Sequence, residues 1–387
     1  MRLGRFIPLI IAVVLGVSTI YFSMVALPVS SGATNVTLRV VYPDALDESD
    51  VSDQFAFQIL AAEGLHVVPT YYDSASLAYE SLVAGQQDIA YDESGGSFGI
   101  GGTQQQTTCI GGYMLGGTFV AIVGDGITEP SQLLGKVADD SGPGSITRFL
   151  NEYWFKQAGI PFNLNAPTNG SVYLRTGKEN YDLVHDIETG VAQEIVVDNF
   201  IIADFESPSV NNSADGGPYH VLFYSPNNNL DTCYVARDNW LENPANQKIA
   251  VDFLAALYQA QRIFISNPAA FVTFAEKFLP LSPVNEIQYS SVFYPEHFTY
   301  WPYGVYNLQG NQSLAVKFQD TVNFFMEAGV LSAPVNNDSV KPYGIINKYF
   351  ELQALQSLGP FVYPKESWVN ANFSSDLQAW VPSWMDS

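Results

Sequence analysis

A serine at the centre of Gly95–Gly99 (GGSFG) has the spacing of the GxSxG elbow that carries the nucleophile of many hydrolases. The segment follows an expected strand, as such an elbow does. More glycines follow it, however, and each costs about 1 kcal/mol inside the helix that an elbow requires. A loop that lines a binding pocket is therefore the favoured interpretation of Ser97, and a serine hydrolase is the alternative. In the hydrolase alternative, the general base for Ser97 would be His185, His220 or His297.

Metal and nucleotide chemistry have little support in the sequence. The four histidines do not fall at metal-ligand spacing, and two cysteines cannot build a cysteine-rich metal site. Gly135-Lys136 is followed by Val137 where a phosphate-binding P-loop needs Ser or Thr. We therefore expect no metal, no cofactor and no catalytic residues.

A glycine-serine turn, Ser141–Ser145 (SGPGS), leads into an expected helix whose free N–H groups favour an anion or a polar oxygen. An ordinary helix cap is the alternative for this turn. Asp92 and Glu93, at the end of another expected strand, would repel an anion. A cationic or zwitterionic group would suit that side of a binding site.

The elements that position these residues follow a regular order. In the first part of the chain after the N-terminal segment, the hydrophobic pattern predicts strands at 37–42, 65–72 and 88–93. Between them lie a helix from a capping Ser52 to Glu63 and a helix from Asp73 or Ser74 to Ala84. Gly64 and Gly85 follow these helices as stops. This βαβαβ order predicts a parallel, doubly wound sheet.

The same order begins again after Gly126. Strands are expected at 136–139, 171–176 and 194–200. A helix capped by Ser145 runs to Ala158, and a second covers 179–189. Two such halves in one chain predict two similar α/β lobes.

Two strand-like runs, Gly116–Gly124 and Asp231–Arg237, are predicted to cross between the lobes. From Asn243 onward the chain is mainly helical, with one helix expected at 313–329. The expected organisation is an N-terminal segment at 1–33, the first lobe at 34–124 and 221–387, and the second lobe at 125–220. Cys109 and Cys233 lie near the crossings, where they could form a disulfide or remain two buried thiols.

The N-terminus indicates the compartment. Arg2 and Arg5 precede Phe6–Pro28, an uncharged run long enough to span a bilayer. We expect an uncleaved membrane anchor with the rest of the chain outside the cytoplasm; the alternative is a signal peptide cleaved after Ala33. Glycosylation sequons fit an exterior location and lie at Asn35, Asn169, Asn211, Asn311, Asn337 and Asn372.

The excess of acidic residues excludes some classes of binding partner. The chain has 16 Lys+Arg against 39 Asp+Glu, a formal charge of -23, which disfavours nucleic acid and anionic membrane surfaces. Apolar residues make up 47% of the chain, enough for a packed core. Carboxylates lose their charge in acid whereas cations keep theirs, so the composition suits an acidic exterior.

Several segments resemble type II solute-binding proteins of ABC importers. Tyr72–Ala90 resembles the helix–strand signature of that family, and Ile127–Gly159 resembles its entry to the second lobe. Lys248–Phe278 and Tyr343–Gly359 are similar to its C-terminal helices. The nearest subgroup binds nitrate, alkylsulfonates and thiamine pyrimidine precursors. Gln132 stands where that family usually has Asp.

The resemblance implies capture of a solute without chemistry. Two lobes would close on a small solute like a hinge and present it to an ABC-type permease. The family's pocket contacts map to Asp44, Ser94, Ser97, Ser141, Gly144, Ser145, Thr147 and Asn199. Tyr42, Tyr91 and Trp301 are candidates for an aromatic lining, with core packing as the alternative role of each.

Overall fold

The structure is a computed structural model that describes 36–44, 46–72, 74–93, 106–115, 118–124, 126–143, 145–176, 180–205, 219–225, 230–297, 323, 326 and 346–359. Several expectations lie outside these residues: the N-terminal segment, the helix at 313–329, and the site residues Ser94, Ser97, Gly144 and Trp301. None of the helices in the described part combines the length and apolar character that crossing a bilayer requires.

The first sheet is mixed. Its order is β2 (Leu65–Tyr71), β1 (Val36–Tyr42), β3 (Ile89–Glu93), β11 (Leu230–Arg237) and β4 (Thr107–Leu115). The first three strands run parallel, as the βαβαβ pattern predicts, and β11 is antiparallel to both β3 and β4. The carboxyl ends of β1, β2 and β3 therefore meet at one edge of this sheet.

The second sheet is also mixed. Its order is β10 (Tyr219–Tyr224), β5 (Phe119–Gly124), β9 (Glu194–Asp198), β6 (Val137–Asp140), β8 (Val172–Thr176) and β7 (Phe162–Asn163). Strands β7, β8, β6 and β9 are parallel, and β5 and β10 add antiparallel strands beside β9. The predicted fold class, two α/β lobes, is confirmed.

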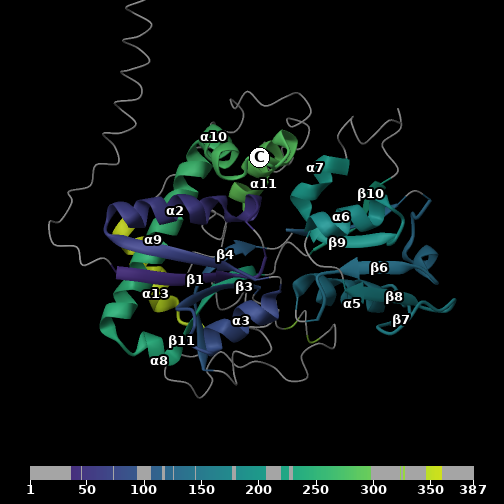
Figure 1. The fold of residues 1–387 in the computed structure, drawn as a ribbon, viewed down its shortest axis with the longest axis horizontal. Coiled ribbons are helices and arrows are strands. Elements are labelled where there is room, and N and C mark those ends of the chain that lie inside the picture. The colour runs from purple at the N-terminus through teal and green to yellow at the C-terminus, as the bar shows by residue number, and fades with distance from the viewer. Residues whose placement is uncertain are drawn as a thin grey trace, which may run out of the picture.

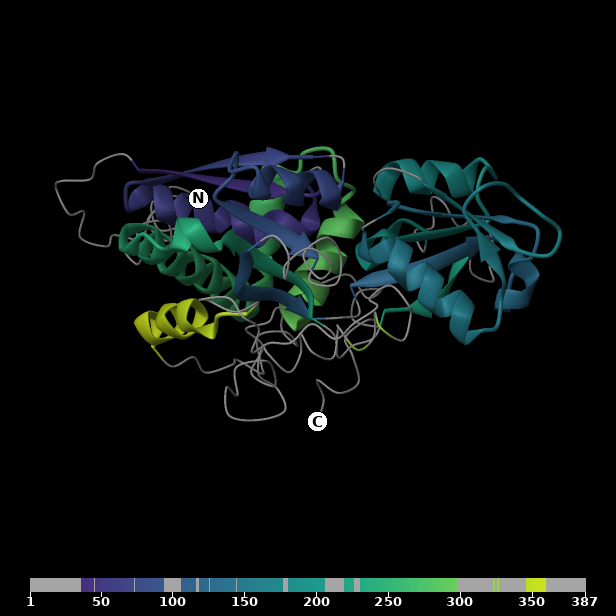
Figure 2. The same ribbon diagram turned by 90° about the horizontal axis from the view of Figure 1, so that it is seen from below.

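The chain crosses between the sheets twice, from β4 to β5 and from β10 to β11. Both runs expected to cross, 116–124 and 231–237, contain strands that pair inside a sheet: β5 belongs to the second and β11 to the first. The chain thus enters the second sheet before residue 119, earlier than the expected boundary at 124. Figure 2 shows the two lobes side by side.

Helices cover both faces of the first sheet (Figure 1). One face packs against α2 (Val51–Ala62) and α9 (Pro244–Ser266), and the other against α3 (Ala75–Val83). In the part of this lobe that the structure describes, the other helices are α8 (Asp238–Leu241), α10 (Pro268–Phe278), α11 (Val284–His297), α13 (Lys348–Leu358) and the single turn η1 (Glu48–Asp50). The second lobe has α5 (Ile146–Gln157), α6 (Asn180–Glu188), α7 (Ile202–Phe205), η2 (Pro130–Leu133) and η3 (Asn199–Ile201).

Local sequence signals set most helix ends. Ser74 and Ser145 cap α3 and α5 through their hydroxyls, and Asn243 caps α9 through its side-chain oxygen. Gly85 (φ 79°) and Gly159 (φ 67°) follow α3 and α5 in the left-handed conformation that glycine adopts without strain.

The predicted cap at Ser52 is wrong. Ser52 lies within α2, and the chain begins to turn earlier, at η1. Asp47 starts this turn: its Oδ1 accepts a hydrogen bond from the Ser49 amide at 2.8 Å, and the Asp47 amide donates to Asp50 Oδ2 at 3.3 Å. This reciprocal pair caps η1, which continues directly into α2, so the helical segment begins before Ser52.

Strands β4 and β10 are not predicted by the sequence. In β4 the pair Gly111-Gly112 lowers the strand signal, since glycine has no side chain to pack. The structure explains Gly111: a Cβ there would lie 2.7 Å from Leu254 Cδ2 and 2.8 Å from the Tyr258 hydroxyl. Close approach of α9 to the sheet requires glycine at this position.

Candidate functional site

The candidate site lies at the carboxyl edges of the two sheets. In the first lobe β1 ends at Tyr42, and the half-buried Asp44 follows in the connection to η1. In the second lobe β6 ends at Asp140 before the glycine-serine turn, and β9 ends at Asp198 before η3. These are the edges at which open α/β sheets bind ligands.

A row of five tyrosines crosses the first sheet, one from each strand. In sheet order they are Tyr71, Tyr42, Tyr91, Tyr234 and Tyr113. The Tyr42 ring stacks on Tyr71 and on Tyr91, with centroids 5.3 and 5.5 Å apart. Tyr91 meets Tyr113 and Tyr234 edge-on at 5.3 and 5.7 Å. We call this set the tyrosine row.

The hydroxyls of the tyrosine row converge on α2 and η1. Asp53 Oδ1 accepts hydrogen bonds from the Tyr42 hydroxyl at 2.7 Å and from the Tyr234 hydroxyl, and the Tyr113 hydroxyl donates to the Ser49 carbonyl. Burial raises the pKa of Asp53 to about 6, against the lowering effect of these phenols. Tyr42 is fully buried here, so its role is core packing rather than the predicted pocket lining.

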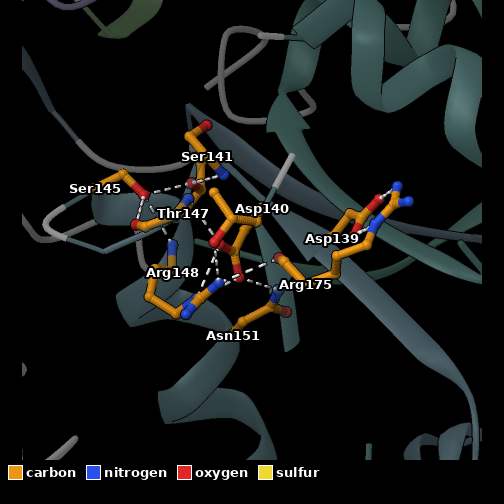
Figure 3. A network of polar contacts seen from close by, with 10 residues as sticks. Asp139, Asp140, Ser141, Ser145, Thr147, Arg148, Asn151 and Arg175 are labelled. Atoms are coloured by element: carbon orange, nitrogen blue, oxygen red, sulfur yellow. Dashed lines mark hydrogen bonds and ion pairs between the residues drawn. The ribbon is translucent and has the colours of Figure 1, made fainter. Parts of the chain in front are cut away.

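Hydrogen bonds to the hydroxyls of Ser145 and Thr147 hold the glycine-serine turn together (Figure 3). Ser145 Oγ donates to the Gly142 carbonyl at 2.7 Å and accepts from the Arg148 amide at 3.2 Å. Thr147 Oγ1 lies 2.9 Å from Ser145 Oγ and accepts from the Ser141 amide at 3.0 Å. The structure thus brings Ser141, Ser145 and Thr147 together and forms the helix cap that was the alternative interpretation of this turn.

A buried ion pair lies beneath this turn. Arg148 Nε donates to Asp140 Oδ2 at 2.7 Å, and the two side chains are 4% and 0% exposed. Asn151 Nδ2 also donates to Asp140 Oδ2, at 3.2 Å, and the Gly142 amide donates to Oδ1 at 2.8 Å. Burial raises the pKa of Asp140, and Arg148 opposes that rise. Asp140 therefore fixes the turn to α5 (Figure 3).

A second arginine beside it is also paired. Arg175 on β8 forms ion pairs with Asp139 and Asp186. Burial raises the pKa of Asp139, and Arg175 opposes that rise. Sequence reasoning missed both pairs. The available signal was the doublet Asp139-Asp140 at the end of a buried strand, where unpaired carboxylates would be costly.

Two hydrogen bonds join the lobes near the candidate site. Ser76 Oγ, at the start of α3, donates to the Pro143 carbonyl of the turn at 3.4 Å. Asn285 Nδ2 on α11 donates to the Ala203 carbonyl of α7 at 2.8 Å. Burial raises the pKa of Tyr91 in the first lobe, and Asp198 in the second lobe is among the charges that add to the rise.

Asn199 and the two cysteines, which the sequence also singled out, are all buried. Asn199 begins η3, is buried, and its amide donates to the Thr118 carbonyl at 2.8 Å beside the first crossing. Cys109 and Cys233 are free, fully buried thiols in one hydrophobic cluster, which is the second of the two alternatives given by the sequence. Burial raises the pKa of Cys233, and the adjacent Cys109 thiol adds to the rise. Both side chains pack in the layer between the sheet and α3.

The features expected for catalysis or metal binding are not assembled in the described residues. His185 on α6 and His220 on β10 are solvent-exposed. No group of three or more His, Cys, Asp or Glu side chains in the described ranges has the geometry to hold a metal ion. Ser97 and the His297 side chain lie outside what the structure describes.

No protein-family model and no curated protein sequence matches this chain. Solved structures match it over most of its length. The ligand-binding component of an ABC-type import system from Staphylococcus aureus, solved with zinc bound, is 10% identical with a TM-score of 0.60, covering 83% of this chain and 99% of that one. The aliphatic sulphonate binding protein SsuA from Escherichia coli is 17% identical with a TM-score of 0.52, covering 78% and 90%.

A third match is the Candida albicans CA3427 gene product, described as having the generic periplasmic binding protein fold. It is 15% identical with a TM-score of 0.57, covering 77% of this chain and 91% of that one. Identities this low show a common fold and leave the ligand undetermined. With two mixed sheets, two crossings and facing carboxyl edges, the chain has the fold of the type II periplasmic solute-binding proteins.

Proposed function

We propose that this chain is an extracellular solute-binding protein that captures a small polar solute between its lobes and delivers it to an ABC-type permease. The observation that carries the proposal is the placement of both carboxyl edges. Asp44 follows the end of β1 at one edge, Asp198 and Asn199 lie at the end of β9 at the other, and in the described residues two strand-to-strand crossings join the lobes. Such a hinge can open to admit a solute and close to bury it.

The N-terminal segment completes this proposal. An apolar run at Phe6–Pro28 would keep the binding lobes at the outer face of the membrane, beside the permease. Cleavage after Ala33 would release them instead. Capture would involve no chemical step and no cofactor. The sequons would then carry glycans on the exposed lobes.

The test is a thermal-shift screen of the purified full-length protein against small polar solutes. A binding protein gains stability from its ligand as RT ln(1 + [L]/Kd), so a solute at 100 times its Kd should stabilise it by about 2.7 kcal/mol. We expect Asp44→Asn in the first lobe and Asn199→Ala in the second to weaken the same solute. Asn165→Ala, in an exposed turn of the second lobe, is the control.

Two outcomes would contradict the proposal. One is the absence of any solute-dependent shift. The other is a solute whose affinity depends on one lobe only, with either Asp44→Asn or Asn199→Ala leaving the Kd unchanged. Turnover of ester substrates that is lost in Ser97→Ala would favour the hydrolase alternative instead.

A further inference from the structure

Helix α11 contacts both lobes. In the first lobe it packs against α9, α10 and η1, and in the second lobe it packs against η3 and α7. Asn285, in its first turn, donates a hydrogen bond from Nδ2 to the Ala203 carbonyl of α7 at 2.8 Å. Ile287, two residues later, is 1% exposed. The helix therefore adds a packed, non-covalent joint to the two strand crossings.

Buried apolar side chains around α11 form one cluster across both lobes. In the first lobe this cluster includes Leu60 of α2 and Phe253 of α9. In the second lobe it includes Phe200 of η3 and Phe205 of α7, and Ile287 of α11 belongs to it as well. Parting the lobes here would expose these side chains to water, which the hydrophobic effect opposes. We call this side of the molecule, which carries α11 and α7, the α11 flank.

The opposite faces of the two sheets are packed separately. In Figure 1, α11 and α7 lie above the two sheets, and α3 and α5 lie below them. Among the described residues, the cluster against α3 contains first-lobe side chains alone, such as Val41 and Leu82. The cluster against α5 contains second-lobe side chains alone, such as Phe149 and Val196. On this side, which we call the α3 flank, the lobes can part without dividing an apolar cluster.

A hydrogen bond at the surface joins the lobes on the α3 flank. Ser76 Oγ, at the start of α3, donates to the Pro143 carbonyl at 3.4 Å, and Pro143 is solvent-exposed. Water can replace an exposed hydrogen bond of this length at little net cost. The bond from Asn285 to α7 is shorter, and buried apolar packing accompanies it.

We propose that α11 is the fixed joint between the lobes and that the cleft opens on the α3 flank, between Ser76 and the glycine-serine turn. The proposal rests on the proposed function and specifies where the solute enters: past α3 and Pro143 rather than past α7. The lobes rotate about an axis along the α11 flank. Asn285 is then a positioning residue, because it holds α7, and with it the adjoining η3, against the first lobe.

Distances between spin labels, measured by pulsed electron paramagnetic resonance, test this asymmetry in the dialysed full-length protein. Leu77→Cys with Gln157→Cys places labels on α3 and α5, across the α3 flank. Val284→Cys with Val191→Cys places labels on α11 and beside α6, across the α11 flank. All four side chains are solvent-exposed. We expect the first pair to give a distance distribution about twofold wider or more than the second, extended toward long distances.

The labelling needs one control. The protein without added cysteines should take up no label, because Cys109 and Cys233 are fully buried.

A variant of α11 then locates the joint. Asn285→Asp keeps the size of the side chain and cannot donate to the Ala203 carbonyl, so it should widen the distribution across the α11 flank. Asn165→Asp makes the same change of charge in an exposed turn of the second lobe and should leave both distributions unchanged. Thermal melting of each variant confirms that it is folded.

The outcomes separate this proposal from the proposed function. Equal widths for the two label pairs, or a wider distribution across the α11 flank, would overturn the placement of the joint. A distribution across the α11 flank that Asn285→Asp leaves unchanged would overturn the role of Asn285. Both results leave solute binding intact, because the thermal-shift screen measures it separately. Failure of that screen would contradict the proposed function, whereas the label distances would still test the joint.

Discussion

The pKa of Asp53 leads to a prediction about stability in acid. Its carboxylate is buried in the first lobe, with the phenol hydroxyls of Tyr42 and Tyr234 as donors, and no cation among the described residues contributes to its pKa. Burial raises its pKa from the ordinary 3.8 to about 6. The folded protein therefore keeps this proton at pH values where the unfolded chain has already lost it.

The sign and the size follow from proton linkage. Because the folded state binds the proton more tightly, stability falls as pH rises from about 3.8 to about 6 and levels off above. A rise of about 2 pKa units corresponds to about 3 kcal/mol, of which about 2 kcal/mol is lost between pH 4.5 and pH 7. Burial also raises the pKa values of Asp50 and Glu194, which adds stabilisation of the same sign in acid.

Asp53→Asn is the perturbation that isolates this effect. The asparagine Oδ1 can accept both phenol hydrogen bonds and does not ionise. We expect urea unfolding to show that the wild-type protein is more stable at pH 4.5 than at pH 7, and that Asp53→Asn reduces this difference by about 2 kcal/mol. A variant with the full wild-type pH dependence would refute the reasoning, as would a wild-type protein that loses stability steeply below pH 4.

Three further variants test the packing around the site by urea unfolding at pH 7. Arg148→Met leaves Asp140 as an unpaired buried charge and should destabilise by about 3–5 kcal/mol; a loss below about 1 kcal/mol would show that water reaches the pair. Gly111→Ala places a methyl group against Leu254 and should cost about 1–3 kcal/mol; an unchanged midpoint would mean that α9 moves freely away. Ser145→Ala removes the α5 cap and should cost about 1 kcal/mol, with no loss indicating that another group caps the helix.

The local features of the fold could be predicted from the sequence because they depend on neighbouring residues. Ser74, Ser145 and Asn243 cap helices wherever the rest of the chain lies, and the alternation of strands and helices predicts two lobes. Strand β10 could not be predicted, because its burial depends on pairing with β5, almost a hundred residues earlier.

The environment of the buried side chains near the site depends on the order of the strands within the sheets. The tyrosine row combines one residue from each of five strands, and nothing in the sequence indicates that β11 inserts between β3 and β4. The environment of Asp53 could not be predicted for the same reason, because one of its hydrogen-bond donors, Tyr234, comes from a distant strand. Asp44 and Asn199 were predicted as site residues because strand ends in such sheets share an edge.

The central claim is that the two lobes enclose a small solute. The most direct test is native mass spectrometry of the purified full-length protein, followed by identification of any molecule released on unfolding. The account predicts one small polar solute per chain, lost in both Asp44→Asn and Asn199→Ala. A protein that carries no small molecule, and whose melting temperature no solute raises, would contradict it.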